Sequence, residues 1–365
     1  MTVTSATITA PSPLSNSYIA GKLPRWTPWV TLVLSWGVFS AVFATLAASG
    51  ATKSFNVVGA VFFGTVLFDL TLYLLSLLIE GSRKAKDRLI TSLVTTAFVI
   101  ALLPLISLLW TVIVQGAARF DVTFFTESMR NIIGDGGGAL HAIVGTILIT
   151  LIAGIISVPI GLLTSVYLVE YGRGALARGI TFFVDVMTGI PSIVAGLFAY
   201  ALFALFLGPG ARSGFIGSVA LSVLMIPVVV RSSEEILRIV PNELREASFA
   251  LGVPKWLTIL KVVLPTSLAG ITTGIVLAVA RVIGETAPLL IVAGFTTDMN
   301  YNPFSNSMMS LPVFVYTQYS QASGLHAQGW VDRAWAGALT LILIVMLLNL
   351  IGRIIARVFA PKYGR

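Results

Sequence analysis

Cysteine is absent from the 365 residues of the chain, and histidine occurs only at His141 and His326. The absence of cysteine excludes disulfides, thiolate metal sites and a cysteine nucleophile. Both histidines fall at or outside the ends of apolar runs, so a histidine metal site is not expected. The sequence also contains no glycine-rich loop of the form Gly-x-x-x-x-Gly-Lys-Ser/Thr, so this chain does not bind ATP by that route.

Charged residues are scarce as well, because they make up 10% of the chain while hydrophobic residues make up 56%. A soluble chain carries about 25% charged residues. Long uncharged runs recur from Trp29 to Ile355, which predicts an all-α protein that crosses a membrane many times. Residues 1–28 are rich in Ser, Thr and Pro and lack a charged start and a cleavage site. We interpret them as a cytoplasmic tail and not as a signal peptide.

The apolar runs predict about eight transmembrane helices, each near the 20 residues that a bilayer requires. Their expected bounds are 29–48, 57–79, 89–115, 140–169, 178–207, 214–239, 267–294 and 334–356. The first two precede the basic run Arg83–Arg88 and are interpreted as an appendage, residues 29–80, to a six-helix core over residues 89–356. Pro191 and Pro227 interrupt the fifth and sixth helices, where the freed backbone groups need a neighbouring helix or a water-filled path. A simple packing kink is the alternative at each proline.

The distribution of basic residues predicts the orientation, because loops rich in Lys and Arg stay in the cytoplasm. With the N-terminus inside, few of the 23 basic residues fall outside. These are Lys53, Arg119, Arg130, Arg212 and Arg333. Both termini are therefore expected in the cytoplasm. The C-terminal tail covers residues 357–365. Because the charge is spread over several inner loops, nucleic acid is not an expected partner. The outer segment 295–333 is either an ordered lid or docking surface, or a solvated loop.

The inner loop over residues 240–266 has the signals of two short helices. Asn242 is expected to cap the first helix, Gly252 to end it in a left-handed conformation, and Pro254 to begin the second. Helices this short are not stable alone in water. We therefore expect the apolar side chains of the loop to dock on another protein or, as the alternative, on the membrane surface. These side chains are Leu244, Phe249 and Leu251.

Two groups of charged residues fall inside otherwise apolar helices, where each charge is costly. Arg231 lies three and four positions before Glu234 and Glu235, and Arg281 lies four positions before Glu285. On a helix these spacings place each arginine beside a carboxylate. The arginine fork matches a tetrahedral oxyanion, so the groups predict an anion path. The alternatives are helix clamps and, for Arg231, a gate. Asp69 and Asp185 are isolated and expected near the membrane interfaces.

The inner loop resembles the loop of importer permeases of the ATP-binding-cassette class, in which Glu-Ala-Ala precedes Gly and then Ile-x-Leu-Pro at fixed spacing. Here the pattern reads Glu246-Ala247-Ser248, Gly252 and Val262-x-Leu264-Pro265. Ser248 and Val262 are conservative departures. The resemblance implies a type I importer fold in which this loop is a coupling helix that fits a groove on an ATPase. The coupling residues that it implies are Glu246, Ala247, Phe249, Gly252, Leu264 and Pro265.

Two further stretches, Pro227–Glu235 and Ala280–Pro288, resemble the permeases of the phosphate-specific importers, and the second resembles their PstA-type subunits. Gly189–Ile193 and Ser310–Thr317 resemble the same subunits, so the resemblance covers about residues 90–360. It implies a phosphate path in the inner membrane that is lined or gated by Arg231, Glu234, Glu235, Arg281, Glu285 and Thr286. The partners it implies are a homologous PstC-type permease, a PstB-type ATPase dimer that carries ATP and Mg²⁺, a PstS-type phosphate-binding protein and membrane lipid. No cofactor is expected in this chain itself.

Three other functions fit parts of the sequence. A permease for another oxyanion, such as molybdate, sulfate or phosphonate, shares the coupling loop and differs only in substrate. A transporter or channel driven by an ion gradient would work without ATP, which the coupling loop argues against. An enzyme acting within the membrane would need a nucleophile and a base there, and the helices offer no Cys or His for those roles.

Overall fold

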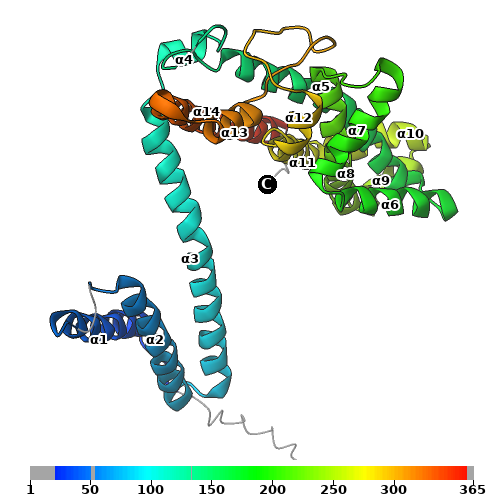
Figure 1. Cartoon of the computed structure of the whole chain (residues 1–365). Coiled ribbons are helices and arrows are strands. Elements are labelled where there is room, and N and C mark those ends of the chain that lie inside the picture. Colours follow the sequence, from blue (N-terminus) through cyan, green and yellow to red (C-terminus); the bar gives the residue numbers. More distant parts are fainter. Residues whose placement is uncertain (1–20, 51–53, 133, 360–365) are drawn as a thin grey trace, which may run out of the picture. The chain divides into compact units, whose positions relative to one another are not determined.

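The structure is a computed structural model, and it describes residues 21–50, 54–132 and 134–359. The described residues contain helices and no strands, as the sequence predicts. The predicted tails over 1–28 and 357–365 lie mostly outside these residues, as does Lys53. The chain divides into two compact units, residues 1–108 and 109–365 (Figure 1).

The first unit contains α1 (Thr27–Ala48), α2 (Val57–Ile79) and most of α3 (Ser82–Ala117). Its corner between α2 and α3 is fixed by Glu80, whose two carboxylate oxygens accept from Arg88 Nε at 2.7 Å and Nη2 at 3.0 Å. The Ser76 hydroxyl and the Leu23 N–H also donate to this carboxylate. Asp69, expected to be isolated, accepts a hydrogen bond from Ser92 of α3. Polar contacts therefore join helices that are otherwise apolar.

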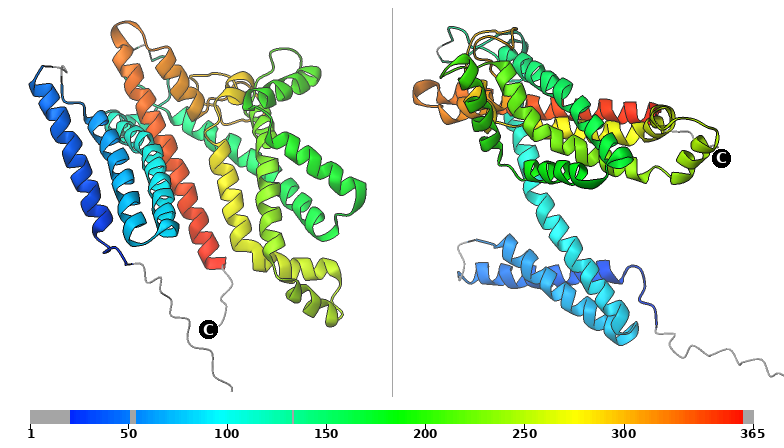
Figure 2. Two further views of the ribbon diagram at one scale, coloured as in Figure 1. Left: turned by 90° about the horizontal axis from the view of Figure 1, so that it is seen from below. Right: turned by 90° about the vertical axis from the view of Figure 1, so that its right-hand side faces the viewer.

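The second unit is built around α5 (Leu140–Val166), α8 (Gly214–Ile239), α11 (Leu264–Val282) and α14 (Ala327–Phe359). The first two pack so closely that a Cβ atom at Gly161 would lie 2.6 Å from Val229 Cγ1. Between membrane helices, small residues permit this approach and van der Waals packing holds the pair. In two views α11 lies between α8 and α14 (Figure 2).

In the described residues, seven helical segments are long and apolar enough to cross a membrane, or eight if one bent pair is a single span. The bent pair is α6 (Gly174–Thr188) and α7 (Ser192–Leu207), which meet at 111°. The sequence predicts one span over 178–207 that Pro191 interrupts, and in the structure this segment forms two helices with a sharp bend between them. Pro191 has no N–H to donate and disfavours helix at the residue before it, so α6 ends and a new helix begins. Pro227, in contrast, lies inside the continuous helix α8.

The two ends of the second unit carry different short elements (Figure 2). One end holds α9 (Asn242–Ala250), α10 (Lys255–Thr258) and two π-helical turns, η1 (Tyr167–Tyr171) and η2 (Ile259–Val263). The opposite end holds α4 (Val122–Thr126), α12 (Ala287–Val292), α13 (Leu311–Ser320) and the short turn η3 (Gly324–His326).

The outer segment 295–333 is packed into the protein over α13 and is not a solvated loop there. Leu311 and Phe314 are fully buried in the main hydrophobic core. The Leu311 N–H donates to Thr146 Oγ1 of α5 at 2.7 Å. α14 begins at Ala327, earlier than predicted, and it carries Arg333. Of the two alternatives for this segment, the ordered one is correct around α13.

Candidate transport path and coupling site

Arg231 lies in the last third of α8, at the centre of a cluster of four charged side chains. Its Nη1 donates to Glu234 Oε2 at 2.8 Å, and its Nη2 donates to Asp185 of α6. Glu234 is buried and accepts from Arg238 Nη2 at 2.7 Å through its other oxygen. Two cations and two carboxylates thus alternate, so the cluster is neutral, which lowers the cost of placing charge inside a membrane.

The cluster confirms one predicted neighbour of Arg231 and corrects two others. Glu234 pairs with Arg231 as expected for positions three apart. Glu235 is exposed and forms no ion pair within the described residues. Asp185, which the sequence left isolated, takes the second place beside Arg231. The spacing along α8 could not reveal this contact because Asp185 belongs to another helix, 46 positions earlier.

The cluster is open to one side. Asp185, Glu234 and Arg238 line an open pocket of about 410 Å³ together with Arg178. The pocket walls also include the apolar side chain of Phe182. A polar solute or water can therefore reach Asp185, Glu234 and Arg238 from the pocket.

Arg281 and Glu285 do not share a helix face, which contradicts the prediction. α11 ends at Val282, and Glu285 and Thr286 lie in the break before α12. Pro288 explains the break, because it lacks the N–H that would reach the carbonyl of Gly284 and its ring would clash there. The predicted continuous span over 267–294 is wrong for the same reason. Arg281 is exposed and forms no ion pair within the described residues.

The two arginines lie at different depths. Arg231 is eight residues from the end of α8 at Ile239, so about 12 Å of helix separates it from the 240–266 loop. Arg281 is 17 residues from the start of α11 at Leu264, so about 25 Å of helix separates it from the same loop. They therefore lie at different distances from the loop and do not form two sides of one compact site.

The 240–266 loop forms the two predicted short helices. The Gly252 N–H donates to Phe249 O at 2.9 Å and the Val253 N–H to Ser248 O at 3.2 Å, while Gly252 has φ of 76°. These bonds form a Schellman motif, which confirms the expected end of α9. Asn242 was expected to be the cap, but α9 begins at Asn242 and Pro241 precedes it.

The predicted coupling residues fall into two groups. Glu246, Ala247 and Phe249 lie exposed on α9, where a partner can reach them. Leu264 and Pro265 lie in the first turn of α11, after the π-helical turn η2. They therefore position the start of a membrane helix and do not extend the exposed surface of α9.

Ser248 departs from the family pattern for a reason that the structure supplies. Its hydroxyl lies 2.8 Å from Thr258 Oγ1, and both side chains are buried. The bond joins α9 to α10, so the two short helices form one element. A buried hydroxyl needs such a partner.

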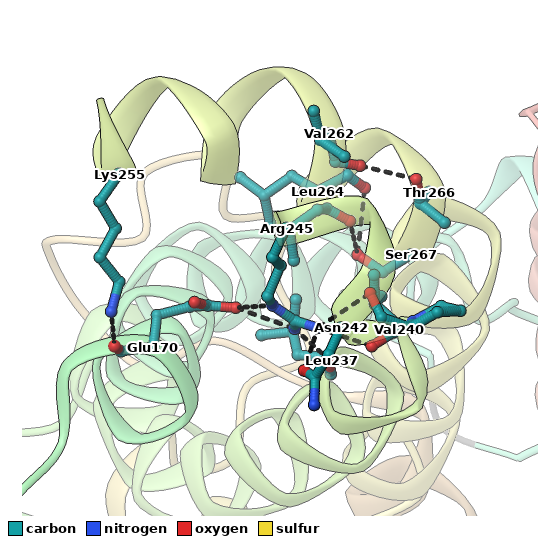
Figure 3. A network of polar contacts seen from close by, with 12 residues as sticks. Glu170, Leu237, Val240, Asn242, Arg245, Lys255, Val262, Leu264, Thr266 and Ser267 are labelled. Carbon is teal, nitrogen blue, oxygen red and sulfur yellow. Dashed lines mark hydrogen bonds and ion pairs between the residues drawn. The ribbon is translucent and has the colours of Figure 1, made fainter. Parts of the chain in front are cut away.

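Two contacts of arginine side chains could not be predicted from the sequence. Arg245 of α9 pairs with Glu170, at the end of the helix that continues α5 (Figure 3). Arg333, predicted to lie in an outer loop, is fully buried and donates to Gln318 Oε1 at 2.8 Å and to Gly134 O at 2.8 Å. The contacts of Arg245 with Glu170 and of Arg333 with Gly134 join residues more than 70 positions apart, so no local pattern predicts them. Gln318 is closer to Arg333 in the sequence.

Comparison with known proteins defines the class of this protein. Residues 157–365 match the family model described as a binding-protein-dependent transport system inner membrane component. The chain belongs to this family and is a multi-span protein of the inner membrane. In this class of transporter the permease is not an enzyme, and ATP hydrolysis is carried out by a separate subunit.

Particular relatives narrow the comparison. The chain is 47% identical over 273 residues to "Phosphate transport system permease protein PstA 1" of Mycobacterium tuberculosis (strain CDC 1551 / Oshkosh), covering 73% of this chain and 88% of the relative. It is 39% identical over 288 residues to the PstA protein of Pasteurella multocida (strain Pm70), covering 78% and 97%. A MetNI methionine ABC transporter in an inward-facing conformation has the same fold at 21% identity and a TM-score of 0.51, covering 61% and 96%.

Proposed function

We propose that this chain is a permease subunit of an ATP-driven importer that moves inorganic phosphate into the cytoplasm. The observation that carries the proposal is the identity of 36–47% to several proteins that are named phosphate transport permeases. The partners in this proposal are a homologous permease, a cytoplasmic ATPase dimer that carries ATP and Mg²⁺, and an external phosphate-binding protein. Both termini lie in the cytoplasm, and the chain carries no cofactor of its own.

The charged residues support a path with two stations. Arg281 is exposed and has the fork that matches two phosphate oxygens. Arg231 forms ion pairs with Asp185 and Glu234. These carboxylates keep Arg231 neutralised and compete with the anion, so phosphate is not held too tightly to leave. Thr286 supplies a hydroxyl beside the first station, and Glu235 remains a candidate contact on α8.

Glu285 is proposed to help distinguish phosphate from sulfate. Hydrogen phosphate carries a proton that it can donate to a carboxylate, whereas sulfate would be repelled by the same group. Glu285 lies in the break after α11, four positions from Arg281, and is half-buried. If a Glu285→Gln variant retained both phosphate transport and sulfate exclusion, Glu285 would not have this role.

Uptake of labelled phosphate at low external concentration tests the proposal. Cells that carry the intact chain are compared with Arg281→Ala and with Arg130→Ala, an exposed arginine far from both stations in sequence. We expect uptake that excess sulfate does not compete away. Loss of one ionic partner of a bound anion costs about 2–5 kcal/mol, so Arg281→Ala should lower uptake at least about tenfold while Arg130→Ala should not.

Three outcomes would contradict the proposal. If the intact chain restores no phosphate uptake but restores uptake of another oxyanion, the substrate is wrong and the transporter class stands. If uptake by Arg281→Ala equals that of the intact chain at equal membrane levels, Arg281 is not part of the path. Uptake that persists without ATP would instead support a transporter driven by an ion gradient.

A further inference from the structure

We infer that Glu170 and Arg245 form a clasp that transmits movement of the α9–α10 helices to α5, and that Arg245 is a positioning residue for transport. The inference rests on the proposed function, because it assumes that an ATPase moves these short helices. It assigns a task to a pair that lies outside the proposed phosphate path.

The two side chains of the pair are mostly enclosed by the protein. Arg245 Nε donates to Glu170 Oε1 at 3.0 Å, and Nη2 lies 2.9 Å from the same oxygen. The side chains are only 12% and 7% exposed. Exposed ion pairs contribute little, whereas removing one partner of a buried pair leaves an uncompensated charge. Removal of either partner would therefore leave a poorly solvated charge on the other.

The same guanidinium also holds the end of α8 (Figure 3). Its Nη1 donates to Val240 O at 2.6 Å and its Nη2 donates to Leu237 O at 3.0 Å. The last carbonyls of a helix have no partners within that helix, so an arginine placed there satisfies them. One side chain of α9 thus joins the end of α8 to the carboxylate of Glu170.

The second short helix is attached to the same residue. Lys255, the first residue of α10, donates through Nζ to the Glu170 backbone carbonyl. Its Nζ also lies 4.7 Å from the centre of the Tyr171 ring, as a cation over an aromatic face. Both short helices therefore hold the turn that contains Glu170.

The position of Glu170 connects the 240–266 loop to α5. α8 and α11 continue directly into the 240–266 loop, so any movement of the loop reaches them through the chain. α5 has no such covalent connection. In the described part of the chain, its side-chain polar contacts with the loop all involve Glu170.

α5 in turn reaches the opposite end of the unit. Thr146, near its start, accepts the N–H of Leu311 in the outer segment. A displacement at Glu170 is therefore carried along one helix from the 240–266 loop to the outer segment. Glu170 itself lies in the π-helical turn η1, and such turns are common at functional positions in helices.

The test is the number of phosphate ions imported per ATP hydrolysed by the complete complex in liposomes, with its ATPase, homologous permease and binding protein. The variants are Arg245→Gln and Glu170→Gln, and the control is Arg173→Gln. Arg173 is an exposed arginine three residues after Glu170 and caps no helix through its side chain. Each variant is compared at equal recovery of the assembled complex.

We expect both clasp variants to hydrolyse ATP near the intact rate but to import at least about fivefold less phosphate per ATP, the lower range of coupling between distant sites. The Arg173 variant should keep the intact ratio. A merely structural role would lower transport and hydrolysis together and leave the ratio unchanged, and that result would overturn the inference. If the intact complex imports no phosphate, the proposed substrate fails, and the same ratio is measured with the oxyanion that it does import.

Discussion

A methyl group added at Gly145 of α5 tests how tightly the outer segment is packed on the membrane helices. A Cβ atom at this position would lie 1.9 Å from the carbonyl oxygen of Met309, and contacts under 3.0 Å do not occur at real Cβ atoms. The backbone segment Met308–Leu311 must therefore move by about 1 Å. The flanking hydrogen bonds, from Met308 N to Ala293 O and from Leu311 N to Thr146 Oγ1, resist that movement.

The magnitude follows from the crowding. Overpacking a buried site costs about 1–3 kcal/mol, so we expect Gly145→Ala to destabilise the protein by at least that amount. Gly154, on the same helix, is the matched control because no atom outside its own helix lies within 4 Å of the added Cβ. Replacing a glycine inside a helix by alanine stabilises it by about 0.5–1 kcal/mol.

The assay is the temperature at which half of the purified protein in detergent leaves the monodisperse peak. The midpoint should fall for Gly145→Ala and should stay or rise for Gly154→Ala. Because the substitution is chemically identical on one helix, helix propensity cancels in the comparison. Equal midpoints for the two variants would show that the backbone at Met309 does not pack against Gly145 of α5.

Two smaller predictions concern the polar contacts. Burial raises the pKa of Glu80, but the ion pair with Arg88 and its other hydrogen bonds lower it more, so the net pKa is lowered. The stabilisation is complete above the ordinary pKa of about 4.3 and is lost as pH falls through the lowered folded value. Glu80→Gln should therefore destabilise the protein at pH 7, and melting curves should converge with those of the intact chain toward pH 3; a gap that widens in acid would contradict this. A double-mutant cycle of Ser248→Ala and Thr258→Ala should give a coupling of about 1 kcal/mol in thermal unfolding, and strict additivity would show that the hydroxyls do not bond.

The charged residues of α8 and α11 show where prediction from spacing succeeds and where it fails. Side chains three positions apart lie next to each other on the same face of a helix, so the Arg231–Glu234 pair could be predicted. The Arg281–Glu285 pair could not form, because the helix ends between the two residues. Gly284 and Pro288 are the local signals for that break.

The sequence alone determined the properties that depend on composition and on short spacing. Long apolar runs require helices in a membrane, because the backbone polar groups must be satisfied within each segment. The short helices of the 240–266 loop follow equally from local signals, since the Gly252 turn needs no distant partner. These features are set by residues that are close together in the sequence.

Only the tertiary structure decided which helices form ion pairs with one another. Asp185 with Arg231 and Glu170 with Arg245 join positions 46 and 75 residues apart. Arg333 became a buried residue because the segment before α5 folds its carbonyls over it. Such pairs depend on how α5, α6, α8 and α9 pack against one another, and a linear spacing carries no information about that packing.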